Sequence, residues 1–222
     1  LLIIAFILVR GLPVVGASFL FTNPEGSGEG GGVLPFVIGT IYLTALAAHG
    51  DPVLGEMEAL GAKRDFPIVG PQVGRLLETT ARACGARRVL ELGSGFGYSA
   101  YWFLRAVGPE GTVFLTEGSA ERAKEADAFL TRGGFAGRFR VEVGDGLAIA
   151  AALTGPFDVV FCDIDKHDYP KALPIAQLLL RTGGLFITDN MLWDGKVLSP
   201  APDDRTTSGV LIPSAPPGRR RR

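Results

Sequence analysis

The sequence predicts an α/β fold with a doubly wound, mostly parallel sheet, and three observations support this. Five short apolar stretches that favour strands alternate with helical patterns between Arg88 and Thr188. A glycine-rich turn follows the first of these strands, and acidic residues follow the fourth and the fifth. In such folds parallel strands are joined by crossover helices, and ligands bind beyond the carboxyl ends of the strands, where these residues lie.

The predicted elements follow in order from Asp51. DPVLGEMEALGAKRD and PQVGRLLETTARACG predict two amphipathic helices, and Gly85 ends the second. The strands are predicted at 88–92, 112–116, 139–143, 158–163 and 184–188, and the helices between them at 99–107, 120–132, 147–153 and 169–180.

The bulk composition favours a small-molecule partner. The chain has 222 residues, a formal net charge of −1 and 20% charged residues, so nothing indicates nucleic acid binding. Cys84 and Cys162 lie in a predicted helix and a predicted buried strand, so no disulfide framework is expected and a cytoplasmic location is favoured. The oligomeric state stays open, with a homodimer as one alternative.

Residues 1–50 form a hydrophobic amino-terminal extension. Its apolar runs, Leu1–Val9 and Val33–Ala48, are shorter than the roughly 20 residues that span a bilayer, and a glycine-rich loop at 21–32 separates them. No basic region or cleavage site precedes them, so a complete signal peptide is not expected and the start looks truncated. The block 1–48 resembles the amino-terminal part of phosphate ABC transporter permeases. An unrelated leader or a reading-frame artefact is the alternative, and membrane association is expected only through this block.

The last segment, residues 201–222, is rich in Pro, Ser and Arg and is expected to be disordered. Its terminal arginines, 219–222, are interpreted as a solvated charge run. The catalytic domain is therefore expected to cover residues 51–200.

The turn after the first strand, ELGSGFGYS, predicts a nucleotide-type ligand. Gly93, Gly95 and Gly97 allow a ligand to approach backbone N–H groups at the start of a helix. The preceding Glu91 suits the cationic donor S-adenosylmethionine (SAM) better than a dinucleotide. Glu117, at the end of the second strand, is placed to accept ribose hydroxyls. After the third strand, Asp145 or the backbone of Gly146 is expected to border the adenine.

CDIDKHDY and TDNMLWDGKV follow the fourth and fifth strands and predict a cation site. Asp163, Asp189 and Asn190 offer two carboxylates and an amide oxygen at neighbouring strand ends, a set that suits Mg²⁺, Mn²⁺ or Ca²⁺ rather than zinc. Lys166, three residues beyond Asp163, would lie beside that cation. The cation's charge favours the neutral amine, which is the form that a general base needs.

These motifs together resemble the cation-dependent catechol and caffeoyl-CoA O-methyltransferase family, which has the class I SAM-dependent methyltransferase fold. The resemblance covers 51–198, with ELGSGFGYS as its first SAM motif, DIDKHDY as its metal-and-lysine motif and DNMLWDGKV as its second metal motif. It implies that the following residues line the SAM pocket: Val69, Glu91, Gly93, Ser94, Ser99, Glu117, Gly146 and Asp163. It also implies that the metal is held by Asp163, Asp189 and Asn190. Lys166 would accept the proton of the acceptor hydroxyl, and Trp193 would form part of the wall of the acceptor site.

The resemblance implies transfer of a methyl group from SAM to a hydroxyl of a small catechol-like or phenolic acceptor. The chain departs from the family at its end, because the last two strands of a seven-stranded sheet have no counterpart after residue 203. Two alternatives therefore remain: a truncated, non-catalytic SAM-binding remnant, and a membrane-anchored, permease-derived fusion.

Overall fold

The computed structural model describes residues 22, 24–25, 30–31, 34, 37–38, 50–198 and 206–207. The chain divides into two compact units, 1–50 and 51–222. In the first unit, the predicted glycine-rich loop contains an antiparallel pair of two-residue strands, β1 (Pro24–Glu25) and β2 (Gly30–Gly31). Most of both apolar runs lies outside the described residues. Within the described part of the chain, no helix is long and apolar enough to cross a membrane.

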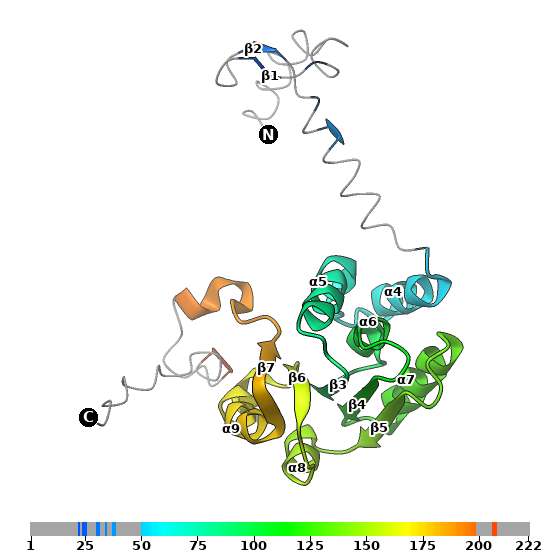
Figure 1. Cartoon of the computed structure of the whole chain (residues 1–222), viewed down its shortest axis with the longest axis vertical. Coiled ribbons are helices and arrows are strands. Elements are labelled where there is room, and N and C mark those ends of the chain that lie inside the picture. The colour runs from blue at the N-terminus through cyan, green and yellow to red at the C-terminus, as the bar shows by residue number, and fades with distance from the viewer. Residues whose placement is uncertain are drawn as a thin grey trace, which may run out of the picture. The chain divides into compact units, whose positions relative to one another are not determined.

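The second unit is built on a parallel sheet of five strands in the order β5-β4-β3-β6-β7 (Figure 1). The strands are β3 (Arg88–Leu92), β4 (Thr112–Glu117), β5 (Phe139–Val143), β6 (Phe157–Cys162) and β7 (Leu180–Thr188). The predicted doubly wound parallel sheet is thus confirmed. In the described part of the chain, β5 and β7 form the two edges of this sheet.

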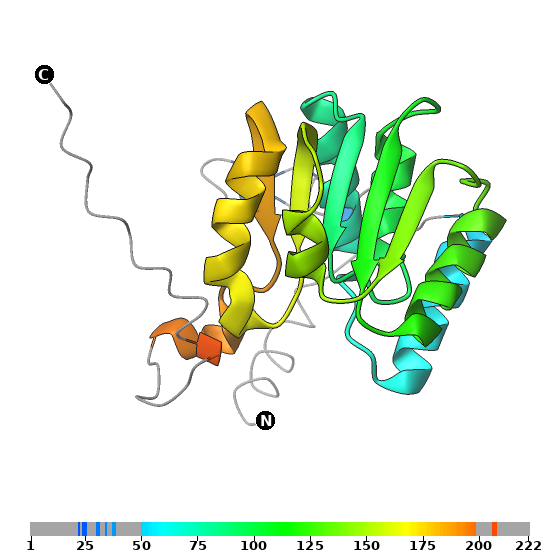
Figure 2. The ribbon, with the colours of Figure 1, turned by 90° about the horizontal axis from the view of Figure 1, so that it is seen from below.

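Helices cover both faces of the sheet (Figures 1 and 2). One face packs against α4 (Pro52–Arg64), α5 (Gly70–Ala83), α6 (Tyr98–Ala106) and α7 (Ala120–Arg132). The other face packs against α8 (Gly146–Ala151) and α9 (Tyr169–Leu179). Two short 3-10 helices, η2 (Lys166–Asp168) and η3 (Trp193–Leu198), follow β6 and β7.

The central strand β3 shows why the sheet needs both layers. Val89 packs into the core beneath α4–α7, whereas Leu90 and Leu92 pack into the core beneath α8 and α9. All three side chains are fully buried, and each contributes about 1.5–3 kcal/mol to stability through the apolar area it buries. An apolar run buried on both faces is typical of a parallel sheet.

Strand β7 begins earlier than predicted, at Leu180 rather than Gly184. Leu180 pairs with Phe157, and a register irregularity follows between Phe157 and Val159. The Arg181 guanidinium donates to Asp158 at 2.6 Å, which holds this first part of β7 against β6. The sequence RTGG has a weak strand propensity, so the long-range pairing overrides the local signal.

Thr206 and Thr207 are the described residues of the segment that was expected to be disordered. Both are helical, and Thr207 has no exposed surface. Thr206 is partly buried, and for the segment as a whole the expectation of disorder stays a prediction. The rest of 201–222 lies outside the described residues.

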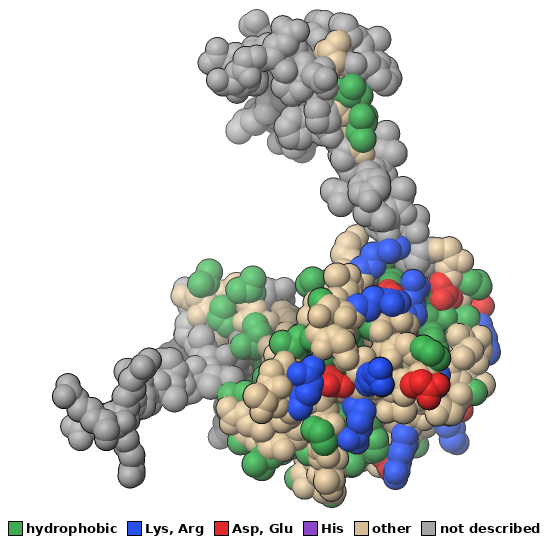
Figure 3. Space-filling model, viewed as in Figure 1, with side chains coloured by type: hydrophobic (Ala, Val, Ile, Leu, Met, Phe, Trp, Pro, Cys, Tyr) green, Lys and Arg blue, Asp and Glu red, His purple; other side chains and the backbone are tan. Residues whose placement is uncertain are grey.

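Basic and acidic side chains are interspersed over the face of the second unit seen in Figure 3, with apolar and neutral polar side chains between them. This face carries no large patch of a single sign.

Candidate active site

A cavity of about 670 Å³ opens beyond the carboxyl ends of β3, β4 and β6. That volume lies within the range of pockets that hold cofactors and other small molecules. Ten of the predicted site residues line it: Val69, Gly93, Ser94, Gly95, Ser99, Glu117, Asp145, Gly146, Asp163 and Lys166. Glu91, Asp189 and Asn190 are not among its lining residues.

The turn between β3 and α6 forms the floor of this cavity and requires glycine at Gly93. Its φ of +79° lies in the left-handed region, and a Cβ there would lie 2.3 Å from the carbonyl oxygen of Asp163. The N–H groups of Gly93 and Ser94 donate to the carbonyl of Thr116 at 3.2 and 3.0 Å, which fixes the turn against β4. The turn therefore packs closely between the ends of β4 and β6, and its backbone borders the cavity.

Glu91 lies behind the cavity wall instead of on it. Its side chain is completely buried, and it hydrogen bonds through Oε1 to the hydroxyl of Ser99, which does line the cavity. Oε2 has no hydrogen-bond partner. Burial raises the pKa of Glu91 from 4.5 to about 8, because the hydrogen bond from Ser99 only partly offsets the loss of hydration. The carboxyl group is therefore mainly protonated at neutral pH.

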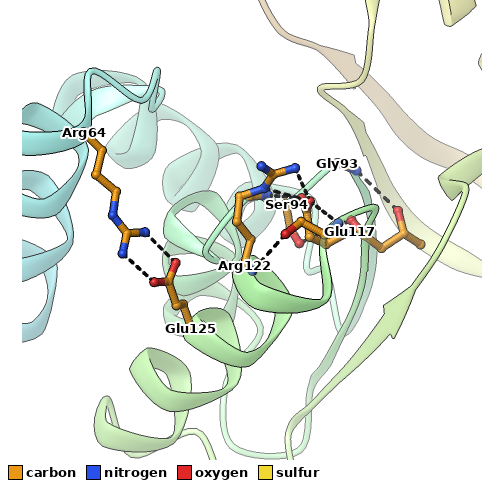
Figure 4. Close-up of polar contacts among 9 residues, drawn as sticks. Arg64, Gly93, Ser94, Glu117, Arg122 and Glu125 are labelled. Atoms are coloured by element: carbon orange, nitrogen blue, oxygen red, sulfur yellow. Dashed lines mark hydrogen bonds and ion pairs between the residues drawn. The ribbon is translucent and has the colours of Figure 1, made fainter.

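Glu117 lies at the end of β4 with only 5% of its side chain exposed. Oε2 accepts the N–H of Gly95 at 2.9 Å. Oε1 accepts the N–H of Ser119 at 2.8 Å and the Nε–H of Arg122 at 2.8 Å (Figure 4). The carboxylate is thus held in one orientation at the edge of the cavity.

The start of α8 borders the cavity next to Glu117. Asp145 caps this helix, since its carboxylate accepts the N–H of Ala148 at 2.8 Å. A Cβ on Gly146 would lie 2.8 Å from the hydroxyl of Thr116. Gly146 thus keeps the helix start close to β4, and both predicted adenine neighbours line the cavity.

The tips of β6 and β7 lie side by side, as the sequence predicted. Cys162 pairs with Thr188 in parallel register, so Asp163 and Asp189 are the next residue on each strand. The N–H of Asp189 donates to the carbonyl of Cys162 at 3.2 Å. Asn190 is exposed and has a φ of +52°, a left-handed conformation that asparagine adopts more readily than most residues.

The charges at these tips influence one another. Burial raises the pKa of Asp163, Lys166 counteracts this, and the negative charge of Asp189 adds to the rise. Within 50–198, no cluster of three or more His, Cys, Asp and Glu residues is arranged to hold a metal ion. Asp163 and Asp189 directly follow two paired strand ends, and Asn190 follows Asp189 in the sequence. By their chemistry, two carboxylates and an amide oxygen suit a hard divalent cation that completes its shell with other oxygen ligands.

Lys166 follows β6 and its side chain is buried. Its Nζ donates to Asp163 Oδ1 at 3.3 Å and to the hydroxyl of Tyr169 at 2.5 Å. The Tyr169 hydroxyl in turn donates to the carbonyl of Asp189 at 2.9 Å. Burial raises the pKa of Tyr169 well above its usual value, so the hydroxyl stays protonated and keeps both contacts.

Sequence reasoning missed Tyr169, which contacts Lys166, and several residues that line the cavity: Phe66, Arg122, His167, Asp168 and Thr206. Tyr169 follows Lys166 at the three-residue spacing that brings side chains together on a helical turn, and this spacing was an available signal. Arg122 and Phe66 also line the cavity, but their contacts depend on the packing of α7 and of the α4–α5 loop. The side chain of Trp193, predicted at the acceptor wall, lies outside what the structure describes.

A model of the O-methyltransferase family matches residues 46–212 of this chain. The catechol O-methyltransferase of Mycobacterium tuberculosis (strain H37Rv) is 35% identical over 165 residues, which cover 73% of this chain and 75% of that protein.

Two solved structures show the same fold. One is the complex with SAM of TomG, an O-methyltransferase of Streptomyces achromogenes involved in tomaymycin synthesis. It is 33% identical to this chain with a TM-score of 0.71, and the match covers 77% of this chain and 79% of TomG. An O-methyltransferase of Bacillus cereus, determined with S-adenosylhomocysteine (SAH), is 29% identical with a TM-score of 0.70, covering 76% of this chain and 80% of that one.

Proposed function

Because this chain belongs to the O-methyltransferase family, whose enzymes use SAM and act on small-molecule acceptors, we propose that it methylates one hydroxyl of a catechol-like acceptor with the help of a divalent cation. One observation carries the proposal. Lys166 is buried against Asp163 at the end of β6, Tyr169 links it to the carbonyl of Asp189 at the end of β7, and Lys166 lines a cavity that also reaches the glycine turn and Glu117. This arrangement brings a base, two carboxylates and a nucleotide-type pocket to one edge of the sheet.

The cavity supports SAM as the methyl donor. The backbone of the glycine turn and the start of α8 border the space for the nucleoside, and Glu117 presents a fixed carboxylate to the ribose hydroxyls. The hydroxyl of Ser99 lines the cavity and donates to the buried carboxyl group of Glu91. The amino-acid end of the donor would contact this hydroxyl. When bound, SAM supplies a methyl group activated by its sulfonium charge.

We assign Asp163, Asp189 and Asn190 as the residues that would hold Mg²⁺, Mn²⁺ or Ca²⁺. Lys166 forms an ion pair with Asp163, and the negative charge of Asp189 acts on Asp163 as well. A divalent cation at these strand ends would be attracted by both carboxylates. A cation held there supplies charge that stabilises an ionised hydroxyl of the acceptor.

Lys166 would accept the acceptor's proton at Nζ, in its neutral form. The hydroxyl of Tyr169 and Oδ1 of Asp163 hold Nζ in position. His167, Asp168 and Thr206 line the cavity near this lysine, and we place the aromatic acceptor there. The enzyme's contribution is mainly alignment of the attacking oxygen with the methyl group, together with removal of the proton.

The test is methyl transfer from isotopically labelled SAM to catechol by the full chain with Mg²⁺, before and after chelation and after Mg²⁺ is restored. We expect turnover that chelation abolishes and added Mg²⁺ recovers. An unchanged rate after chelation would refute the role of the cation. Binding of SAH without turnover on any vicinal diol tested would instead support the non-catalytic remnant.

A further inference from the structure

The cavity wall beside Glu117 contains a guanidinium group whose contacts the proposed chemistry does not use. Arg122 lies in the first turn of α7, one turn beyond Ser119, which caps that helix. We propose that Arg122 is a positioning residue for the cofactor's ribose, because its guanidinium orients the Glu117 carboxylate and is itself held in place by the Phe66 ring. This inference rests on the proposed function, since it takes Glu117 as the ribose ligand.

The first step is the distribution of hydrogen bonds on the carboxylate. Arg122 contacts Oε1 through Nε at 2.8 Å and through a terminal nitrogen at 2.7 Å, and the N–H of Ser119 reaches the same oxygen. Oε2 accepts only the N–H of Gly95 among the contacts that the structure gives it. A carboxylate has roughly four acceptor positions. The remaining capacity therefore lies mainly on Oε2, the oxygen next to the glycine turn.

The second step is the rigidity of the arrangement. Two nitrogens of the planar guanidinium contact Oε1, while the N–H of Gly95 holds Oε2. The two oxygens are therefore held from opposite sides, and loss of Arg122 would leave Oε1 with the N–H of Ser119 alone. Figure 4 shows the Arg122 side chain turned toward Glu117, while Arg64 on α4 pairs separately with Glu125 on α7. Glu117 is 5% exposed and Arg122 is 41% exposed. The pair thus lies at the rim of the cavity, where solvent screens part of its attraction.

The third step is the contact with the α4–α5 loop. The Arg122 guanidinium lies 5.7 Å from the centre of the Phe66 ring, which is within the range of cation–π attraction. Phe66 packs against Phe96 with ring centres 5.2 Å apart, and a Cβ on Gly95 would lie 3.0 Å from the Phe66 ring. Arg122 therefore connects the loop, the glycine turn and the carboxylate. Its loss would loosen the site that receives the ribose without touching the transferred methyl group.

The test compares Arg122→Ala, Arg122→Lys and wild type by calorimetric titration with SAH, and with its 2′-deoxy and 3′-deoxy analogues. We expect the Kd for SAH to rise about tenfold in R122A, as for a lost charge-assisted contact, and about threefold in R122K, which keeps the charge but not the planar fork. For at least one deoxy analogue, the difference between wild type and R122A should fall below about twofold. In turnover, KM for SAM should rise while kcat stays near the wild-type value.

Arg64→Ala is the matched control, because Arg64 makes a bidentate pair with Glu125 on the same helix at similar exposure and does not line the cavity. R64A should bind SAH like wild type, even if the melting temperature of the free protein falls as much as in R122A. Unchanged or tighter SAH binding by folded R122A would overturn the inference, as would an equal loss for SAH and both deoxy analogues. If R122A does not fold, R122K decides the question by the same criteria.

Failure of the underlying function gives a different result. If wild type itself does not bind SAH, the cofactor assignment is wrong and the inference falls with it. If wild type binds SAH and Glu117→Gln does not weaken binding, Glu117 is not the ribose ligand. A loss of SAH binding in E117Q combined with no loss in R122A and R122K rejects the role of Arg122 while leaving Glu117 as the ribose ligand.

Discussion

Replacing Glu91 by glutamine should change how the stability of the domain depends on pH. Glu91 is completely buried, and burial raises the pKa of its carboxyl group from 4.5 to about 8, with Ser99 opposing the rise and the charges of Asp163 and Glu117 adding to it. The folded state therefore holds a proton that the unfolded chain releases above pH 4.5. This contribution to stability is complete below pH 4.5 and is lost as the pH rises through about 8.

The size of the effect follows from the pKa change. One pKa unit corresponds to about 1.4 kcal/mol, so the rise from 4.5 to about 8 corresponds to about 5 kcal/mol over the full range. Between pH 5 and pH 8 the wild type should lose about 4 kcal/mol of unfolding free energy relative to Glu91→Gln. Glutamine keeps the shape of the protonated acid and does not titrate in this range.

The assay is urea unfolding of both proteins at pH 5, 6, 7 and 8, with the difference in unfolding free energy plotted against pH. Glu110→Gln, at an exposed glutamate in the turn before β4, controls for the loss of one formal negative charge. A difference between wild type and E91Q that stays constant across these pH values would refute the account of Glu91.

Three further predictions concern the base, the glycine turn and the end of the sheet remote from the cavity. Lys166→Ala should lower kcat about 10²- to 10⁴-fold, as for a lost general base, with SAH affinity retained, whereas Lys124→Ala, at an exposed lysine on α7, should leave both unchanged. Gly93→Ala should weaken SAH binding and lower the free energy of unfolding by about 2 kcal/mol or more in urea titrations, because its φ is +79° and its Cβ would lie 2.3 Å from a carbonyl oxygen. Burial alone would raise the pKa of Asp158, but hydrogen bonds from an arginine and two backbone N–H groups hold it below 3.8. This stability is present above pH 3.8 and is lost as the pH falls through the folded value, so Asp158→Asn should destabilise the protein at pH 7 and match wild type in strong acid, as followed by thermal melts.

The fold could be predicted because its signals are local. Strands β3 and β5 and helix α7 occur at the predicted residues, since each has a clear apolar pattern and α7 also begins at the capping residue Ser119. The start of β7 was missed, because Leu180 and Arg181 join the sheet through partners on β6 that no local pattern reveals.

The positions of the candidate site residues could be predicted where those residues lie at a strand end. Asp163, Asp189 and Glu117 each follow or end a strand, so the parallel topology alone brings them to one edge of the sheet. The details behind the cavity wall could not be predicted in this way. Whether Glu91 faces the cavity or lies behind Ser99, and which side chain orients Glu117, depends on how α6 and α7 pack against the sheet.

The most direct test of the account is binding of Mn²⁺ to the full chain, followed by electron paramagnetic resonance of the free ion during titration. The account predicts one Mn²⁺ per chain, with affinity about tenfold weaker or worse after either Asp163→Asn or Asp189→Asn and unchanged after Asp165→Asn, at an exposed neighbour that is not a proposed ligand. Wild-type affinity in both the Asp163 and Asp189 variants would contradict the claim that these two strand tips together hold the cation.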